Sequence, residues 1–399
     1  MSLRSDAAAL HPELVALRRD LHRAPEIGLE LPRTQEKVLG ALDGLGLEIA
    51  LGERLTSVTA VLRGGGGPGG TVLLRGDMDA LPVTEASGEE FSSEVAGAMH
   101  ACGHDLHTAG LVGAARLLAA RRDELRGDVV FMFQPGEEGC DGAGAMLDEG
   151  VLTASGRPVD AAFGLHVSAS RTARGRFTCR PGPLMAASDA VEVRVLGAGG
   201  HGSAPEQSRD PIPAACEMVS ALQTRMTRGF GAFEPAVLTV GSFHAGTRRN
   251  VIPDDAVFEA TVRSFDPEVR ERIRAEVIRV CEGIAAAHGL DVEVRYEAEY
   301  PLTVNHDEGH EFVAGTVREV FGEERFTLLP QPMTGSEDFS RVLAKVPGAF
   351  VFLGASRSAD PDTAPDNHSP RAAFDDSVLA DGATLLAELA CRRLTVLAA

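Results

Sequence analysis

Three histidines, a cysteine and an aspartate crowd into nine residues of this 399-residue chain, in the segment MHACGHDLH at positions 99–107. Imidazole and thiolate are the usual protein ligands of zinc and of chemically similar ions. The short spacing between Cys102 and His104 lets both side chains reach one centre from a tight turn. The alternative is a polar helix N-terminus, capped by Asp105 or Thr108, with its histidines in solvent. One histidine would suit that alternative, but this density favours a metal site.

A second cluster, QPGEEGCDG, places Glu137 and Glu138 directly after an apolar stretch that we expect to be a strand. Ligands of open α/β sheets bind beyond the carboxyl ends of strands, which is where this pair falls. Adjacent carboxylates on a bent turn point in different directions, so one can bind metal while the other handles protons. An exposed acidic turn is the competing interpretation, because the chain carries a formal net charge of −20. The position after a strand favours the site.

Two isolated histidines could complete such a site. His166 in GLHVS ends another expected strand, and His368 in DNHSPR lies in a polar loop before the last expected helix. Taken alone, each fits a structural or surface role better than a ligand role. Beside the two clusters, His166 becomes a candidate for the third corner of the site.

Other candidates lie outside these clusters. His201 lies in the glycine-rich loop GAGGHGSAP, where an exposed catalytic group and an incidental loop histidine are equally good interpretations. Asn250 follows two arginines, and Arg263 within a strand is either part of a solvated face or a bidentate clamp for a carboxylate. The segment MTGSEDF predicts first a helix N-cap box at Ser336, with Gly335 as a candidate substrate-loop residue.

The elements that must position these residues follow two patterns. Strand-like runs at 71–74, 128–133 and 161–165 alternate with helix-like stretches, of which the clearest are 106–122 and 376–394. This alternation is typical of a sheet with helices packed on its faces. We therefore expect an α/β catalytic domain.

The middle of the chain has a different order of elements, namely strand, helix, two strands, helix and strand. The expected segments are 191–195, 211–228, 237–243, 257–265, 267–288 and 292–296. This β-α-β-β-α-β order is that of a ferredoxin-like unit. It predicts a catalytic domain formed by residues 1–181 and 299–399, interrupted by a smaller domain at residues 182–298.

Composition excludes several classes of partner. The charge of −20 would repel a nucleic acid backbone, so we expect a small-molecule ligand. No run reaches the roughly 18 apolar residues that a membrane span requires, and the first residues contain no apolar signal core. The six cysteines form no CxxC pair. These features indicate a cytoplasmic protein that does not bind membranes or nucleic acid.

In their order along the chain, eight motifs resemble the M20 metallopeptidase family, and more closely its amidohydrolase branch of N-acyl-amino-acid, hippurate and indole-acetyl-amino-acid hydrolases. The motifs are RGDMDALP, MHACGHDLH, QPGEEG, GLHV, GGHGSAP, HAGTRRNVIP, GSEDF and HSPR. The resemblance covers nearly the whole chain. It implies a zinc-peptidase-like catalytic domain with an inserted lid domain that often makes the dimer contact. A homodimer or higher homo-oligomer is therefore expected.

The resemblance also implies two divalent metal ions per chain, with Glu137 as the general base. The implied ligands are Cys102, His104, Glu138, His166 and His368. Cys102 is the implied shared ligand, at a position where other branches of the family use an aspartate. Those branches also carry a His-x-Asp pair where this chain has Asp77-Met78-Asp79. A metal-binding histidine is thus missing there, and Asp79 is expected to support the ligands from behind.

Three residues of the inserted domain match lid residues of the family. His201, Asn250 and Arg263 match positions at which members of the family contact the scissile carbonyl or the carboxylate of the substrate. In the family, that histidine often reaches the active site of the partner subunit.

The expected activity is metal-dependent hydrolysis of the amide bond in an N-acyl amino acid. Zinc, manganese, cobalt and nickel all suit the mixed donor set. Three alternatives stay open: a metal-dependent dipeptidase or aminopeptidase, an amidase that uses Cys102 beside His104 as nucleophile, and a silent binding protein of the same fold.

Overall fold

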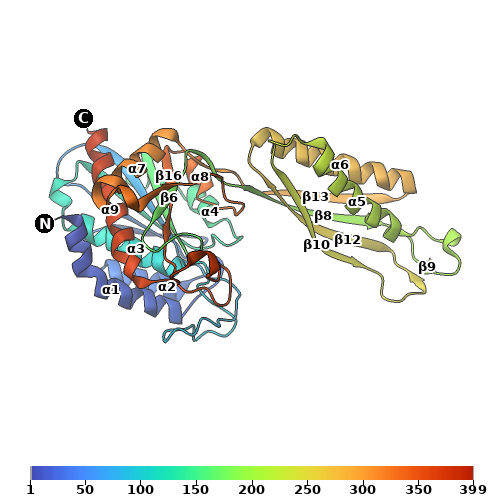
Figure 1. Cartoon of the computed structure of the whole chain (residues 1–399), viewed down its shortest axis with the longest axis horizontal. Coiled ribbons are helices and arrows are strands. Elements are labelled where there is room, and N and C mark those ends of the chain that lie inside the picture. The colour runs from blue at the N-terminus through green and yellow to red at the C-terminus, as the bar shows by residue number, and fades with distance from the viewer. Residues whose placement is uncertain (1, 399) are drawn as a thin grey trace. The chain divides into compact units, whose positions relative to one another are not determined.

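The computed structural model describes residues 2–398, which form two compact units (Figure 1). The first unit comprises Met1–Leu184, Val304–Gln331 and Asp338–Ala399, and the second comprises Met185–Thr303 and Pro332–Glu337. The role of the second unit as a lid stays a prediction.

An eight-stranded mixed sheet is the framework of the first unit. In the order in which they lie side by side, its strands are β1 (Glu48–Leu51), β2 (Val58–Arg63), β4 (Gly127–Gln134), β3 (Gly70–Asp77), β5 (Ala161–Ser168), β16 (Gly348–Gly354), β6 (Phe177–Cys179) and β15 (Phe326–Leu328). The four central strands β4, β3, β5 and β16 are parallel and almost completely buried. Their carboxyl ends therefore meet at one edge of the sheet. The α/β fold and the three expected strands of this domain are confirmed.

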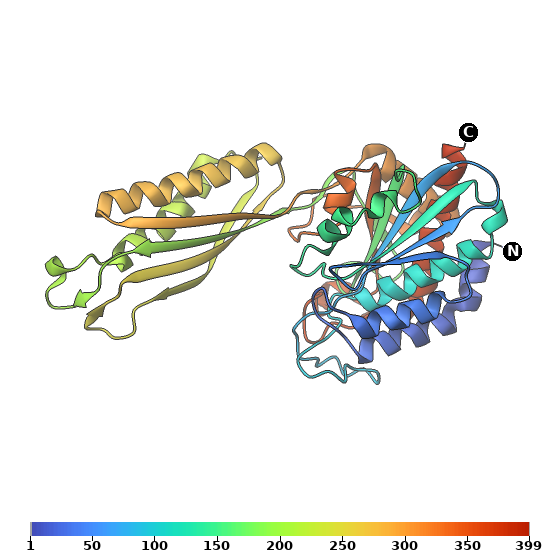
Figure 2. The ribbon, with the colours of Figure 1, turned by 180° about the vertical axis from the view of Figure 1, so that it is seen from behind.

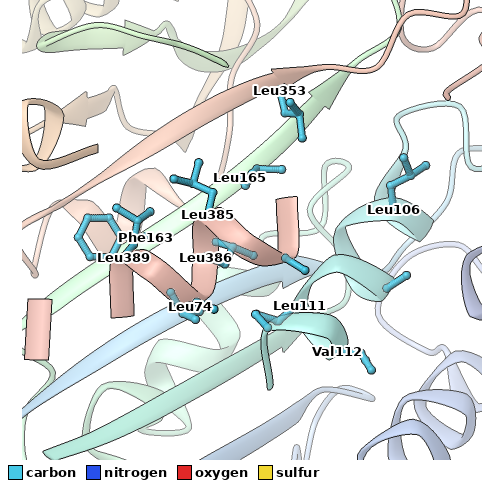
Figure 3. Close-up of a cluster of buried hydrophobic side chains, with 14 of the residues drawn as sticks. Leu74, Leu106, Leu111, Val112, Phe163, Leu165, Leu353, Leu385, Leu386 and Leu389 are labelled. Carbon is cyan, nitrogen blue, oxygen red and sulfur yellow. The ribbon is translucent and has the colours of Figure 1, made fainter. Parts of the chain in front are cut away.

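Helices cover this sheet. They are α1 (Leu3–Arg23), α2 (Pro32–Leu42), α3 (His104–Ala119), α4 (Gly142–Asp148), α7 (Asp307–Phe321), α8 (Ser340–Leu343) and α9 (Leu379–Leu397). Helices α3 and α9 pack on β3 and β5, and α1 packs against both helices (Figure 2). Figure 3 shows the leucines of α9 that fill the space above the sheet, among them Leu385, Leu386 and Leu389, close to Leu74 and Phe163 of the strands.

The second unit is a four-stranded antiparallel sheet with two helices. Its main elements are β8 (Ala187–Leu196), α5 (Pro211–Gly229), β10 (Ala236–Ala245), β12 (Asp255–Ser264), α6 (Pro267–His288) and β13 (Asp291–Tyr300). The strand order is β10-β12-β8-β13, which is the ferredoxin-like arrangement. Valines of β8 alternate toward a core shared with α5 and α6. The predicted β-α-β-β-α-β unit is therefore confirmed.

Two short strand pairs complete the fold. In the second unit, β9 (Gly200–His201) pairs with β11 (Val251–Ile252), and elsewhere β7 (Gly182–Met185) pairs with β14 (Thr303–Asn305). Within residues 2–398, no helix has the length and apolar character needed to cross a membrane.

Gly103 is the residue that lets the start of α3 approach β5. It precedes the helix with a φ of +84°, in the left-handed region. A Cβ atom added there would lie 2.4 Å from Cγ2 of Val167 and 3.1 Å from Phe374. Both the backbone conformation and the close contact therefore require glycine between Cys102 and His104.

We predict that Gly103→Ala destabilises the protein more than Gly97→Ala does. Gly97 also has a positive φ, of +78°, but no atom lies within 4 Å of an added Cβ. The control should cost about 1 kcal/mol for the left-handed backbone, whereas overpacking at Gly103 should add about 1–3 kcal/mol. Urea unfolding monitored by circular dichroism measures both, and equal losses would contradict the close approach.

Candidate metal centre

The candidate residues gather at the carboxyl edge of the parallel strands. Asp79 follows β3, Glu137 follows β4 and His166 lies near the end of β5. The turn that contains Cys102 and His104 begins α3, which connects β3 to β4, and His368 lies in the loop after β16. Five segments that are distant in sequence thus reach one place because four strands run in the same direction.

Cys102, His104 and His166 form the first group of potential ligands. One ligand atom from each lies within 4.8 Å of the others, and all three side chains are buried. Nδ1 of His166 donates to the carbonyl of Val167 at 2.7 Å, so the lone pair is on Nε2, which lies 3.4 Å from Sγ of Cys102. Burial holds the pKa of His166 well below its usual value. The imidazole is therefore neutral, the form that binds metal.

Cys102 also belongs to a second group, with Glu138 and His368. Nε2 of His368 lies 3.1 Å from Oε1 of Glu138. Hydrogen bonds to Cys102 and Glu138 raise the pKa of His368 to about 10. This shift reports a strongly negative environment, which is what a cation would compensate. His368 also has a φ of +69°, an unusual backbone conformation for a residue with a side chain.

Glu137 lies beside both groups and is held by Asp79. Glu137, Glu138 and His104 form another close group, in which Oε2 of Glu137 is 4.0 Å from Nε2 of His104. The two oxygens of Asp79 accept hydrogen bonds from the backbone N–H groups of Glu137 and Glu138, each at 3.0 Å. Asp79 therefore fixes the turn that presents the two carboxylates. Gly136 starts this turn with a φ of +72°, and an added Cβ would meet Leu29 at 2.4 Å.

The environment of His104 tests whether a metal ion fits. Within residues 2–398, neither ring nitrogen of this fully buried histidine has a hydrogen-bond partner. The nearest carboxylate oxygens are 3.4 Å away on Asp79 and 3.6 Å away on Asp77. Burial lowers the pKa of His104, but the carboxylates of Asp77 and Asp79 outweigh it and raise that pKa well above its usual value, which reports negative surroundings that a cation would compensate. Thiolate, imidazole and carboxylate donors at these positions fit zinc or a similar divalent ion.

A group formed by Asp77, His104 and His107 has a different role, although its ligand atoms are equally close. Nε2 of His107 accepts the backbone N–H of Val167 at 2.7 Å, and Nδ1 faces Oδ1 of Asp77 at 2.5 Å. Nδ1 must therefore carry the proton, and no lone pair of His107 is left for a metal. His107 instead supports the end of β5 beside His166.

A buried ion network behind the centre was not foreseen from the sequence. Arg75 pairs with Asp77 and, at 3.0 Å, with Asp338, and its Nε donates to Gln134 at 2.9 Å. Gln134 in turn donates to both oxygens of Asp338. The predicted N-cap at Ser336 is wrong, because α8 begins at Ser340. Asp338 of the same motif joins this network instead.

The helix-cap alternative for the histidine-rich segment is also wrong. Gly103 occupies the N-cap position of α3, and His104, Asp105 and His107 are buried. Asp105 lies 2.7 Å from Nε of Arg18 and 2.7 Å from Nδ1 of His22. These contacts tie α1 to the segment that carries Cys102 and His104.

His201 and Asn250 lie together in the second unit. Nδ1 of the exposed His201 accepts the backbone N–H of Ser203 at 3.2 Å, so the free ring nitrogen Nε2 carries the hydrogen. The backbone carbonyl of Asn250 accepts a hydrogen bond from Gly202 at 2.9 Å, beside the β9–β11 pair. His201 thus presents an N–H donor to its surroundings. Gly335 accepts a backbone hydrogen bond from Ala186 at 2.9 Å in the same unit.

Arg263 is anchored through one nitrogen only. Its Nη1 contacts the hydroxyls of Ser188 and Thr261, each at 2.6 Å, and the carbonyl of Val262 at 3.0 Å. Among residues 2–398, no hydrogen bond uses its Nε or Nη2, and no carboxylate forms an ion pair with it. The charges of Glu299 and Asp189 nevertheless act on this guanidinium, whose pKa burial lowers.

The register of the four-stranded sheet in the second unit separates Arg263 from His201. Arg263 pairs with Ser188 at one end of the β8–β12 ladder, and Asp255 pairs with Leu196 at the other. Eight residues of strand span roughly 26 Å. His201 and Asn250 lie beyond the Leu196 end. Within one copy of this unit, Arg263 and His201 therefore lie toward opposite ends of the sheet.

The structure is that of an α/β protein with metal-type ligands at the carboxyl edge of its sheet. A profile of the peptidase family M20/M25/M40 matches residues 73–392. The chain is 39% identical to thermostable carboxypeptidase 2 of Saccharolobus solfataricus, over 98% of each chain. It is 36% identical to N-acetyl-L-cysteine deacetylase of Bacillus subtilis, over 97% of this chain and 89% of the relative.

A solved structure agrees with these relatives. The YXEP protein of Bacillus subtilis, described as a dinuclear metal binding peptidase of the M20 family, superimposes with a TM-score of 0.82. It is 34% identical in sequence, and the match covers 97% of this chain and 99% of that one. This chain therefore belongs to the M20 peptidase family and is a hydrolase of its amidohydrolase and peptidase type.

We predict that Cys102→Ser lowers metal occupancy below the two ions per chain expected of a dinuclear site, because serine is a poor replacement for a thiolate shared by both ligand groups. Cys140→Ser is the matched control, since Cys140 is exposed and belongs to neither group. Metal analysis of reconstituted protein measures occupancy, and full occupancy of the Cys102→Ser variant would remove Cys102 from the site.

Proposed function

We propose that this protein hydrolyses the amide bond of N-acyl amino acids, with two divalent ions held by Cys102, His104, Glu138, His166 and His368. The observation that carries the proposal is that Cys102 belongs to two ligand groups, one with His104 and His166 and one with Glu138 and His368. The deacetylase relative supports the substrate class.

The first group would hold one ion and the second group the other. Ions bound there would lower the pKa of a water molecule toward about 7 and polarise the carbonyl of the substrate. The chain must supply the remaining functions itself, namely proton transfer, stabilisation of the oxyanion and binding of the carboxylate.

Glu137 is the proposed proton carrier. Its carboxylate takes a proton from the attacking water and gives it to the amine as the carbon–nitrogen bond breaks, so that one water is consumed and an acid and an amine are formed. Asp79 keeps Glu137 in place through its backbone N–H. Glu138 shares a ligand group with Cys102, whereas Glu137 belongs to no group that contains Cys102. The proposal therefore gives the adjacent glutamates different purposes.

The second unit supplies the remaining groups. The Nε2–H of His201 is a donor suited to the oxyanion, and the guanidinium of Arg263, with Asn250, is suited to the substrate carboxylate. Since His201 and Arg263 lie at opposite ends of one lid, we propose that they come from two subunits. Dimerisation would then complete each active site.

The lid sheet offers an edge for such a dimer. Its two outer strands are β10 and β13. On β10, Val237 and Phe243 are exposed, whereas β13 presents alternating charged residues. Charged edges discourage strand pairing, and an exposed apolar edge permits it. We therefore propose that β10 is the edge against which a second copy packs.

We predict that Glu137→Gln retains both ions and loses at least 100-fold in turnover, which is within the range for general acid–base catalysis. Glu138→Gln is the contrasting variant and should lose metal. Amine release from a panel of N-acetyl and N-benzoyl amino acids measures turnover, and metal analysis measures occupancy. Near-normal turnover of Glu137→Gln would end the assignment of the base.

The same panel, extended with dipeptides, tests the alternative functions. Hydrolysis of dipeptides and not of N-acyl amino acids would indicate a peptidase. Activity that survives a chelator would favour the Cys102 nucleophile, because such an amidase requires no metal. No hydrolysis of any amide by metal-loaded protein would indicate a binding protein.

We predict that mixing Arg263→Ala with His201→Ala restores activity. In a mixed dimer, one active site receives both intact residues and the other receives neither. With random exchange, half of the dimers are mixed and half of their sites are complete, so activity should approach one quarter of that of the unmodified protein. Each variant alone should be nearly inactive. If both residues served the same site from one subunit, mixing would restore nothing.

A further inference from the structure

Asn367 connects three of the segments that carry the proposed ligands. Its Oδ1 accepts the backbone N–H of Ala169 at 2.9 Å. Its Nδ2 lies 3.1 Å from the carbonyl of Val167 and 3.3 Å from the carbonyl of Cys102. Val167 follows His166, and His368 follows Asn367 itself. One side chain therefore contacts or adjoins three of the five ligands.

The hydrogen bonds fix the orientation of this amide. Ala169 offers an N–H, so the atom that faces it must be the oxygen. The other two partners are carbonyls, so the atom that faces them must be the nitrogen. Reversing the amide would place oxygen against two carbonyls and nitrogen against an N–H. Nδ2 therefore has a defined direction, toward Cys102.

The same nitrogen lies 3.7 Å from Sγ of Cys102, within hydrogen-bond distance for sulfur. An N–H group aimed at a thiolate stabilises the negative charge and reduces how much electron density the sulfur gives to a metal. A thiolate between two cations is the ligand most affected by such a donor, because it interacts with both.

We propose that Asn367 positions and tunes Cys102 as the shared ligand of the metal centre. This inference rests on the proposed two-metal function. The two hydrogens of Nδ2 serve three acceptors, so the sulfur receives an N–H that is shared with a carbonyl, and the amide holds the Cys102 turn against the end of β5. The same contacts place His368, whose backbone N–H donates to the carbonyl of Ala101 at 2.9 Å. Asn367 thereby joins the segments that carry Cys102, His166 and His368.

Cobalt substitution tests this role without measuring activity. Thiolate bound to Co²⁺ gives a charge-transfer absorption band whose energy depends on the electron density of the sulfur. The variants are Asn367→Asp, which keeps the shape but replaces the N–H donors with a charged carboxylate, and Asn367→Ala, which removes the donors without adding a charge. Circular dichroism establishes that each variant is folded.

Ser170→Ala is the matched control. Ser170 donates to Asp366 at 2.6 Å, so it anchors the same loop without contacting the sulfur. It separates a general effect of loosening the loop from an effect on Cys102.

The expected result is a 10- to 100-fold loss of Co²⁺ affinity in both Asn367 variants, as is typical for residues that support metal ligands. The charge-transfer band should also shift to lower energy, because the sulfur loses its N–H donor. In Ser170→Ala, the band should stay in place. If Asn367→Asp loses affinity while its band does not move, the contact with sulfur is overturned and only loop anchoring is left.

Failure of the proposed function gives a different result. If the unmodified protein binds no Co²⁺, or binds it without a thiolate band, then Cys102 is not a ligand and both proposals are overturned. If that band is present and neither Asn367 variant changes it or the affinity, only the inference about Asn367 is overturned.

Discussion

Arg75 lies fully buried between two carboxylates, Asp77 and Asp338, which come from widely separated parts of the sequence. Removing one partner from such a buried ion pair costs about 3–5 kcal/mol, because the other charge is left without compensation. The arrangement of the site depends on this pairing. Asp77 faces Nδ1 of His107, and the other ring nitrogen of His107 holds the end of β5 beside His166. Asp338 accepts the N–H of Ala143, just after the turn that carries the two glutamates.

The carboxylates near the candidate metal centre differ in the groups that compensate their negative charge. Asp77, Asp105 and Asp338 are compensated by arginines, whereas Asp79 is compensated by two backbone N–H groups. Among residues 2–398, no arginine forms an ion pair with Glu138, and Nε2 of His368 lies 3.1 Å from its Oε1. The raised pKa of His368 reports a negative environment where the two ligand groups share Cys102. This environment would favour the binding of cations in the proposed metal centre.

The sequence predicted the clusters well, because local patterns carry their chemistry. The density of MHACGHDLH and the glutamate pair after a strand both indicated a metal site, and the order of elements predicted both sheets. His166 and His368 could not be assigned from local patterns, because a single histidine has no spacing to interpret. Only the family resemblance predicted that they are ligands. In the structure, each of the two histidines shares a group of potential ligands with Cys102.

The remaining features of the site depend on contacts between residues that are distant in the sequence, so local patterns could not predict them. Nothing near Asn367 in the sequence shows that its amide will reach Cys102, which is 265 residues away. The buried role of Asp338 was missed because its motif also fits a helix cap. The separation of Arg263 from His201 required the register of β8 and β12, since both residues match lid residues of the family. Such relations depend on the tertiary fold.

The origin of the ligands also has a consequence for how the protein unfolds. Cys102 comes from the start of α3, while His368 precedes α9, the last helix of the chain. Ions bound between them would act as cross-links that close a loop of more than half the chain. Binding free energy at such a site is folding free energy, because the unfolded chain does not preserve the site. Metal supply would then govern how long the protein survives proteolysis as well as how fast it works.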